Sequence, residues 1–340
     1  MKPAPHPVKA AITNLFGDAT VAGTITAVHL VAAVGDRVAT DRPSYARADQ
    51  KVTVHAIVQV GHGLFGDVAT AELGRKTVHV QPLAHAPRFS IAWNRIEPAA
   101  ASYSNTEGGT FHFEAIAYRA TAIDDAHETA LTADVRPTLT TDHGHGVGTM
   151  RFQAVVTQGD LAITSPGPEA RRGRGSGGLT DAVLRVTIRR DDTYLGYLTE
   201  MYGQPYIWAS AGLSDATHEA ERLEGSDCAD FIVYGARRGG KKLAYTWTGG
   251  LPQITTLVAS GTRGDDGIYR DAKGTPLAFP KVGDLILFPR HVGAIVEDKG
   301  TIGVLDDHDI MMHTLFDSPK EQPIADSGYA DKPVELRRFK

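Results

Sequence analysis

The chain has almost no cysteine, with one residue, Cys228, among 340. A single cysteine excludes an intrachain disulfide and a cysteine-rich zinc site, so disulfides say nothing about the redox compartment. Long hydrophobic runs are also absent, because no stretch approaches the ~18 apolar residues of a membrane span. The net charge of −5 argues against a nucleic-acid partner. We therefore expect a folded, water-soluble protein without a membrane span.

The length exceeds that of one ordinary domain, since domains mostly hold ~100–200 residues. Hydrophobic residues make up 42% and charged residues 22%, which is typical of globular proteins. Residues 1–18, MKPAPHPVKAAITNLFGD, contain prolines where a secretory signal needs ~7–15 consecutive apolar residues. Two or three domains are expected, and no signal peptide is visible.

The N-terminal part shows the alternation of antiparallel strands. Residues 51–58 and 110–117 alternate apolar and polar side chains, with turn residues between such runs. Residues 41–54 resemble the opening strands of macroglobulin-like and immunoglobulin-like modules. We expect an all-β sandwich region over 1–164, formed by one elaborated module or two small ones.

A compositional break follows this region. Residues 165–179 are rich in Gly, Pro, Ser and Arg, which predicts a linker or long loop. Beyond it, Asp192 can cap a helix in which Leu195, Leu198 and Met201 recur at helical spacing. A separate domain of mixed α and β structure is therefore expected over 180–340.

The cysteine lies in the stretch GSDCADFI, residues 225–232. The sequence predicts that Cys228 opens a helix capped by Asp227 or Ser226 and ended by Gly239. A thiol at a helix N-terminus feels the positive end of the macrodipole, which lowers its pKa. Such a thiol is a candidate nucleophile.

Thiolate chemistry on an acyl group also needs a base and a group that orients the base. The run RHVGAIV predicts a strand that begins at His291, and DIMMHT predicts a later strand that carries His313 near its end. These two histidines are the candidate partners of the cysteine.

These motifs together resemble the NlpC-type cell-wall endopeptidases, a branch of the papain-like cysteine peptidases. GSDCADFI, VGDLILF, RHVGAIV and DIMMHT match the elements of that family in order, and YGQPYIW resembles its upstream Gly-x-Pro-Tyr-x-Trp segment. The resemblance covers residues 192–316. It implies an α+β papain-like domain in which the helix that carries the cysteine packs on an antiparallel sheet.

The resemblance also implies residue roles. Cys228 would be the nucleophile, His291 the general base and His313 the residue that orients His291. The backbone amide of Cys228 and the Tyr206 hydroxyl would stabilise the oxyanion. Asp227 and Trp208 would contact the substrate, with Asp227 holding the free amine of a short stem peptide. No metal or cofactor is implied.

The substrate class implied is the peptide part of peptidoglycan, which leads us to expect an extracytoplasmic location. The N-terminal β region would then position the enzyme or bind a protein or wall partner. The chain departs from the family pattern at Ala209-Ser210, where Gly-Gly is usual, and at Ala229-Asp230, where Ser-Gly is usual. Two apparent insertions lie near 211–224 and 259–278.

Two other readings remain open. The first stays within the same clan and comprises a CHAP-like amidase, an acyltransferase or a protein-directed peptidase. The second is a non-catalytic binding protein with a degenerate papain-like domain. The intact cysteine and both histidines favour an enzyme, whereas the changes at Ala209 and Ala229 keep the binding protein open.

Overall fold

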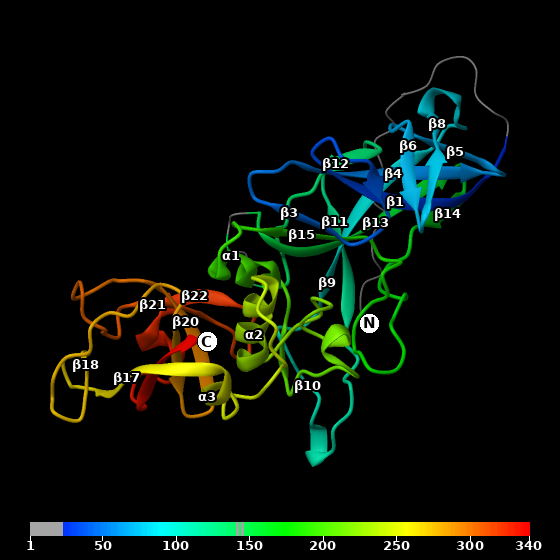
Figure 1. Ribbon diagram of the computed structural model, residues 1–340. Coiled ribbons are helices and arrows are strands. Elements are labelled where there is room, and N and C mark those ends of the chain that lie inside the picture. The colour runs from blue at the N-terminus through cyan, green and yellow to red at the C-terminus, as the bar shows by residue number, and fades with distance from the viewer. Residues whose placement is uncertain (1–22, 141–142, 144–145) are drawn as a thin grey trace, which may run out of the picture.

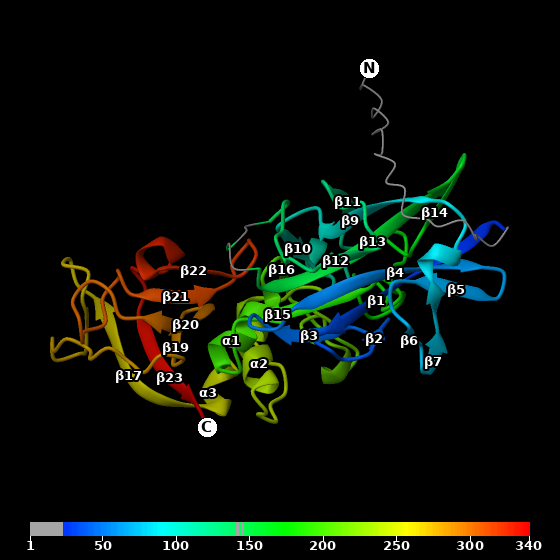
Figure 2. The same ribbon diagram turned by 90° about the horizontal axis from the view of Figure 1, so that it is seen from above.

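The protein is described by a computed structural model that covers residues 23–140, 143 and 146–340. Residues 1–18, in which no signal peptide was visible, lie outside the described residues. Figures 1 and 2 show two N-terminal sheets, a C-terminal sheet, and the helices α1 and α2 between them.

The first sheet has eight strands in the order β7-β6-β2-β1-β4-β5-β8, with β12 paired to β4. Their bounds are β1 Ile25–Val34, β2 Ala39–Thr40, β4 Val52–Val60, β5 Gly63–Gly66, β6 Thr70–Leu73, β7 Lys76–His79, β8 Gln81–Pro82 and β12 Ala130–Thr132. In β4, the alternating residues Val52, Val54 and Val58 are buried in the main core. The apolar alternation of this segment therefore faces the second sheet.

The second sheet has six strands in the order β11-β9-β13-β15-β3, with β14 paired to β13. Their bounds are β3 Ser44–Arg47, β9 Ser90–Pro98, β11 Tyr118–Ile123, β13 Gly148–Gln158, β14 Leu161–Thr164 and β15 Arg185–Arg189. Strand β15 follows the predicted linker, yet it pairs antiparallel with β13 and parallel with β3. The domain boundaries at 164 and 180 stay a prediction.

The remaining strands form a two-stranded and a seven-stranded sheet. Strands β10 (Ser102–Ser104) and β16 (Tyr206–Trp208) pair in parallel. The larger sheet has the order β18-β17-β23-β19-β20-β21-β22. Its bounds are β17 Thr255–Arg263, β18 Tyr269–Arg270, β19 Leu285–Phe288, β20 His291–Glu297, β21 Ile310–His313, β22 Lys320–Pro323 and β23 Val334–Phe339.

Helices are few and short among the described residues. The α-helices are α1 Tyr194–Leu198, α2 Cys228–Arg238 and α3 Leu251–Ile254. The 3-10 helices are η1 Leu83–His85, η2 Glu107–Gly109, η3 Thr199–Met201, η4 Asp215–Thr217 and η5 Ile324–Ser327. No helix of the described part is long and apolar enough to cross a membrane.

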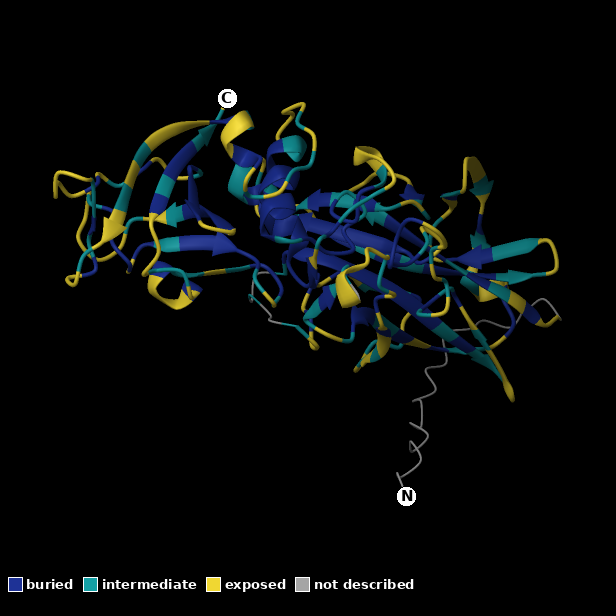
Figure 3. Cartoon of the chain, turned by 90° about the horizontal axis from the view of Figure 1, so that it is seen from below, coloured by how far each residue is buried: buried dark blue, intermediate teal, exposed yellow. Residues whose placement is uncertain are grey.

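The main core runs through both halves of the molecule. One cluster of buried side chains contains Trp93 and Phe152 of the second sheet together with Phe231 of α2 and Met312 of β21. Figure 3 shows buried residues along the N-terminal strands and in the helices beside them. The helix that begins at Cys228 is therefore held between two layers of sheet.

The predicted α+β papain-like fold of the C-terminal half is wrong. In the described part of the chain, strands hold 41% of the residues and helices 11%, and the three short α-helices found there do not make a helix-on-sheet α+β domain. The helical spacing of Leu195, Leu198 and Met201 produces five residues of α1 followed by the 3-10 turn η3. Most apolar surface is instead buried by strands, which tertiary pairing selects over local helix propensity.

Candidate active site

Cys228 is the first residue of α2, as the sequence predicts. The side chain of Asp227 caps the helix, because its Oδ1 accepts hydrogen bonds from the backbone N–H groups of Ala229 and Asp230, each at 2.9 Å. The N–H of Cys228 is not one of the two groups that this carboxylate caps. The thiol is buried, with 4% of the residue exposed. The capped start of the helix thus holds Cys228 in place, and the backbone N–H of Cys228 remains free of this cap and can bind another acceptor.

The two predicted histidines lie on neighbouring antiparallel strands. His291 opens β20 and His313 ends β21, and the two strands pair through Ala294 and Met312. Nε2 of His291 and Nδ1 of His313 are 2.8 Å apart, which is a hydrogen bond between buried rings. Both rings are fully enclosed, so this bond sets the orientation of His291.

The other nitrogen of His291 has no partner. Among the described residues, its buried Nδ1 makes no hydrogen bond. Helix α2 contacts β20. The backbone N–H of Val292, the residue after His291, hydrogen-bonds to the Cys228 sulfur. The structure therefore places His291 next to His313 and beside the helix that begins at Cys228. Nε2 of His291 is bonded to His313, and its Nδ1 has no hydrogen-bond partner among the described residues.

Burial dominates the titration of all three groups. It raises the pKa of the Cys228 thiol, and the nearby Asp227 carboxylate adds to the rise. It lowers the pKa of His291 to about 3 and that of His313 to about 4. The helix dipole was expected to lower the pKa of the thiol. Desolvation of the thiolate has a larger effect in the opposite direction, so the pKa rises. The resting pair is a neutral thiol and a neutral imidazole.

Tyr206 and Trp208, the other aromatic candidates, belong to β16. Tyr206 is buried, and burial is the largest cause of the raised pKa of its hydroxyl, which stays a donor. Trp208 is 39% exposed. Both line a cleft of about 860 Å³. Tyr329, which also lines this cleft, stacks on His291 with ring centroids 4.7 Å apart. Cys228, His291 and His313 do not line the cleft themselves, and Tyr329 connects it to His291.

One wall of this cleft comes from the N-terminal half, which the sequence did not indicate. Ser102, Tyr103, Ser104 and Glu114 line it opposite a set from the C-terminal half. That second set includes Tyr206, Trp208, Pro289, Arg290, Phe316 and Tyr329. The parallel pairing of β10 with β16 brings the two sets together. A pairing between such distant segments leaves no local signal in the sequence.

Two residues at which the chain departs from the NlpC-type pattern, Ser210 and Asp230, contact each other next to the turn that precedes Cys228. The Oγ of Ser210 donates to Oδ2 of Asp230 at 2.6 Å and accepts from the backbone N–H of Asp227 at 2.9 Å. His218, from the apparent insertion at 211–224, places Nε2 3.4 Å from Oδ2 of Asp230. Its Nδ1 accepts from the N–H of Ala220 at 3.2 Å, so the proton of the neutral ring lies on Nε2. This network supports the turn before Cys228.

The same insertion ties the cleft wall to the site. Asn105 donates to Oε2 of Glu219 at 2.8 Å and to the carbonyl of Ala209 at 3.2 Å. Its Oδ1 accepts from the N–H of Glu114 at 2.9 Å. Burial raises the pKa of Glu219 to about 7, and its Oε1 has no hydrogen-bond partner among the described residues. The buried side chain of Asn105 thus joins the N-terminal wall of the cleft to the C-terminal segment that holds Ala209 and Glu219.

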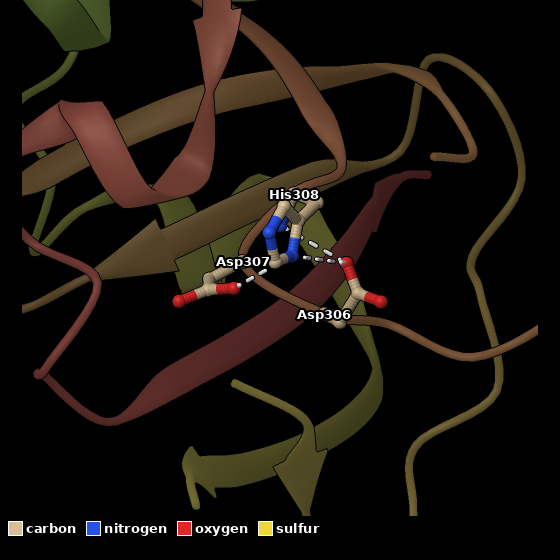
Figure 4. A group of neighbouring side chains, drawn as sticks. All are labelled: Asp306, Asp307 and His308. Atoms are coloured by element: carbon tan, nitrogen blue, oxygen red, sulfur yellow. Dashed lines mark hydrogen bonds and ion pairs between the residues drawn. The ribbon is translucent and has the colours of Figure 1, made fainter. Parts of the chain in front are cut away.

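One group of described side chains could hold a metal ion. Ligand atoms of Asp306, Asp307 and His308 lie within 4.8 Å of one another (Figure 4). Asp306 already accepts the N–H groups of Thr301 and His308, and Asp307 pairs with Arg263 at 2.6 Å. The group stabilises the loop between β20 and β21.

Comparison with known proteins adds no further information. No protein-family model matches the chain, and no curated protein or solved structure matches it. The resemblance to NlpC-type endopeptidases stays a prediction from the motifs.

Proposed function

We propose that the protein is a cysteine hydrolase that cleaves amide bonds through Cys228, His291 and His313. The observation that carries the proposal is the 2.8 Å bond between Nε2 of His291 and Nδ1 of His313. It leaves the buried Nδ1 of His291 without a hydrogen-bond partner among the described residues, beside the helix of the only cysteine in the sequence. A buried, unpaired nitrogen is costly unless it has a use. Accepting the thiol proton is such a use.

The neutral resting state defines the first step. In the proposed tautomer, Nε2–H of His291 donates across the 2.8 Å contact to Nδ1 of His313, so Nδ1 of His291 carries the lone pair. As Cys228 Sγ attacks the amide carbonyl carbon, the S–H bond breaks, its proton moves to Nδ1 and a C–S bond forms. The thiolate is then never free, which fits the raised pKa of the thiol.

The later steps use groups at the same place. The backbone N–H of Cys228 and the hydroxyl of Tyr206 stabilise the oxyanion. The imidazolium of His291 gives its proton to the leaving amine as the C–N bond breaks. Water, deprotonated by His291, then hydrolyses the thioester, and the acid product leaves with the thiol restored.

The substrate class proposed is the peptide part of peptidoglycan, supported by the motif resemblance and by the size of the cleft. Such a substrate would require an extracytoplasmic location. In this proposal the N-terminal β region helps to bind the substrate, since β10 and Glu114 form one wall of the cleft.

The test is digestion of purified peptidoglycan with wild type and Cys228→Ala, followed by mass spectrometry of the released fragments. We expect peptide fragments from wild type alone, and their masses identify the bond. His308→Gln is a matched control, because it changes an exposed histidine that contacts Asp307. Release by Cys228→Ala would refute the proposed nucleophile. No release by any variant would refute the wall as substrate and favour protein or other acyl substrates.

A further inference from the structure

The turn before His291 has a backbone better suited to glycine. Strands β19 and β20 pair through Phe288 and His291, so Pro289 and Arg290 alone connect them. Arg290 has a φ of 69°, in the left-handed region that an L side chain disfavours and glycine adopts freely. The turn itself therefore gains nothing from an arginine, and the reason for this residue must lie in its side chain.

Backbone of this kind gathers around the cleft. Five described residues other than glycine have a positive φ. Two of them, Arg290 and Phe316, line the cleft, and a third, Ala209, follows the lining residue Trp208. Strained backbone persists mainly where function requires it. Its concentration here indicates that these side chains are placed for a ligand.

The guanidinium of Arg290 has no ion-pair or hydrogen-bond partner among the described residues. It is exposed at the cleft, and among the described residues no carboxylate or carbonyl pairs with it. In contrast, Arg238 and Arg263 both bind carboxylates. The acidic residue that lines the cleft, Glu114, already accepts the backbone N–H of Ser104 at 2.6 Å. The cleft thus presents one unpaired cation next to the proposed base.

We propose that Arg290 binds a carboxylate of the substrate, so that the cleft selects acidic peptides. An arginine fork holds a carboxylate through two parallel N–H···O bonds, with both charge and direction. Because Arg290 precedes His291, the carboxylate lies close to the scissile amide. This inference deepens the proposed function and rests on it for the identity of the reaction, although carboxylate binding itself needs no catalysis.

Binding is measured in the Cys228→Ala background, where no turnover can occur. The probes are N-acetyl-Ala-Glu and its neutral counterpart N-acetyl-Ala-Gln, titrated by calorimetry at low salt. We expect the acidic peptide to bind at least tenfold more tightly, and Arg290→Gln to abolish that difference while Arg290→Lys keeps part of it. Equal affinities for the two peptides, or no binding of either, would overturn the carboxylate site.

A second measurement separates this site from the chemistry. Cys228 is the only thiol, so its alkylation rates by anionic iodoacetate and neutral iodoacetamide can be followed by mass. We expect the rate with iodoacetate divided by the rate with iodoacetamide to fall at least threefold in Arg290→Gln, and likewise for wild type in high salt. An unchanged ratio contradicts the role of Arg290. A sulfur that neither reagent reaches contradicts the proposed nucleophile and leaves the peptide titration to decide on Arg290.

The glycine variant controls for folding. In Arg290→Gly the turn keeps its left-handed backbone without a side chain, so its melting temperature should equal or exceed that of wild type. We expect this stable variant to lose the preference for the acidic peptide. A folded Arg290→Gly that keeps the preference would show that another group binds the carboxylate.

Discussion

The two halves of the cleft are built in different ways. The chemical half takes its groups from α2, β20 and β21, which lie within the C-terminal part of the chain and contact one another directly. The recognition half takes one wall from β10 and Glu114 and holds it to β16 by strand pairing and by Asn105. The proposed catalytic groups thus depend on neighbouring elements, whereas the shape of the cleft depends on segments from both halves of the chain.

The largest effect should come from the chemical half. His291→Gln removes the acceptor of the thiol proton, so kcat should fall by about 10⁴-fold while KM changes little. His313→Asn retains an acceptor for Nε2–H and should lose far less. Steady-state kinetics with the peptide substrate checks both, and a His291→Gln enzyme with more than a hundredth of wild-type kcat would contradict the mechanism.

At the junction between the two halves, ionisation of the buried Glu219 carboxyl group should lower the stability of the folded protein. Glu219 holds its proton up to about pH 7 in the folded protein, whereas the unfolded chain releases it near pH 4.3. Stability is therefore lost as the pH rises through this window. Glu219→Gln should gain about 2–3 kcal/mol more at pH 8 than at pH 5. Denaturant unfolding at both pH values measures this, and an equal gain would contradict the raised pKa.

The recognition half should affect binding rather than chemistry. Asn105→Ala removes the hydrogen bonds that hold the N-terminal wall of the cleft. KM should rise about 30-fold while kcat stays within threefold of wild type, because the lost binding affects ground state and transition state alike. Asn94→Ala is a matched control, because it loses one hydrogen bond to Gln153 inside the second sheet. A fall in kcat with KM unchanged would show that the wall acts on the reacting groups.

The network behind the cysteine should behave as one unit. Ser210→Ala and Asp230→Asn each loosen the turn before Cys228 and should lower kcat about tenfold, and the double variant should be no slower than either, because the two side chains share one hydrogen bond. Multiplying effects in the double variant would show that the two residues act separately.

The smallest effect should be on the pH profile. The pKa of His291 is lowered to about 3, so the base remains neutral well into acid. Between pH 7 and pH 5, kcat/KM should change less than twofold, whereas a histidine of ordinary pKa near 6.5 would lose about 20-fold. An acid limb near pH 6.5 would show that His291 is solvated in the working enzyme.

The sequence predicts features that depend on nearby residues. The cap at Asp227 and the start of α2 at Cys228 follow from capping rules, and the strands of His291 and His313 follow from local alternation. The fold class of the C-terminal half was wrong, because the length of a helix and the partners of a strand are settled by packing.

Other features depend on tertiary contacts that no local rule contains. Burial reverses the expected shift of the thiol pKa, and the pairing of Ser102 with Tyr206 places an N-terminal wall at the site. The contact between Ser210 and Asp230 was visible only as two separate departures from a motif.

The position of β15 has a consequence for biosynthesis. Strand β15 lies between β13 and β3 in the second sheet, although β3 ends at Arg47 and β15 begins at Arg185. At a translation rate of ~5–20 residues per second, the edge of β3 waits roughly 7–28 s for its partner. Open edges invite pairing with other chains. The nascent N-terminal half is therefore vulnerable to aggregation until β15, which precedes α2, has been made.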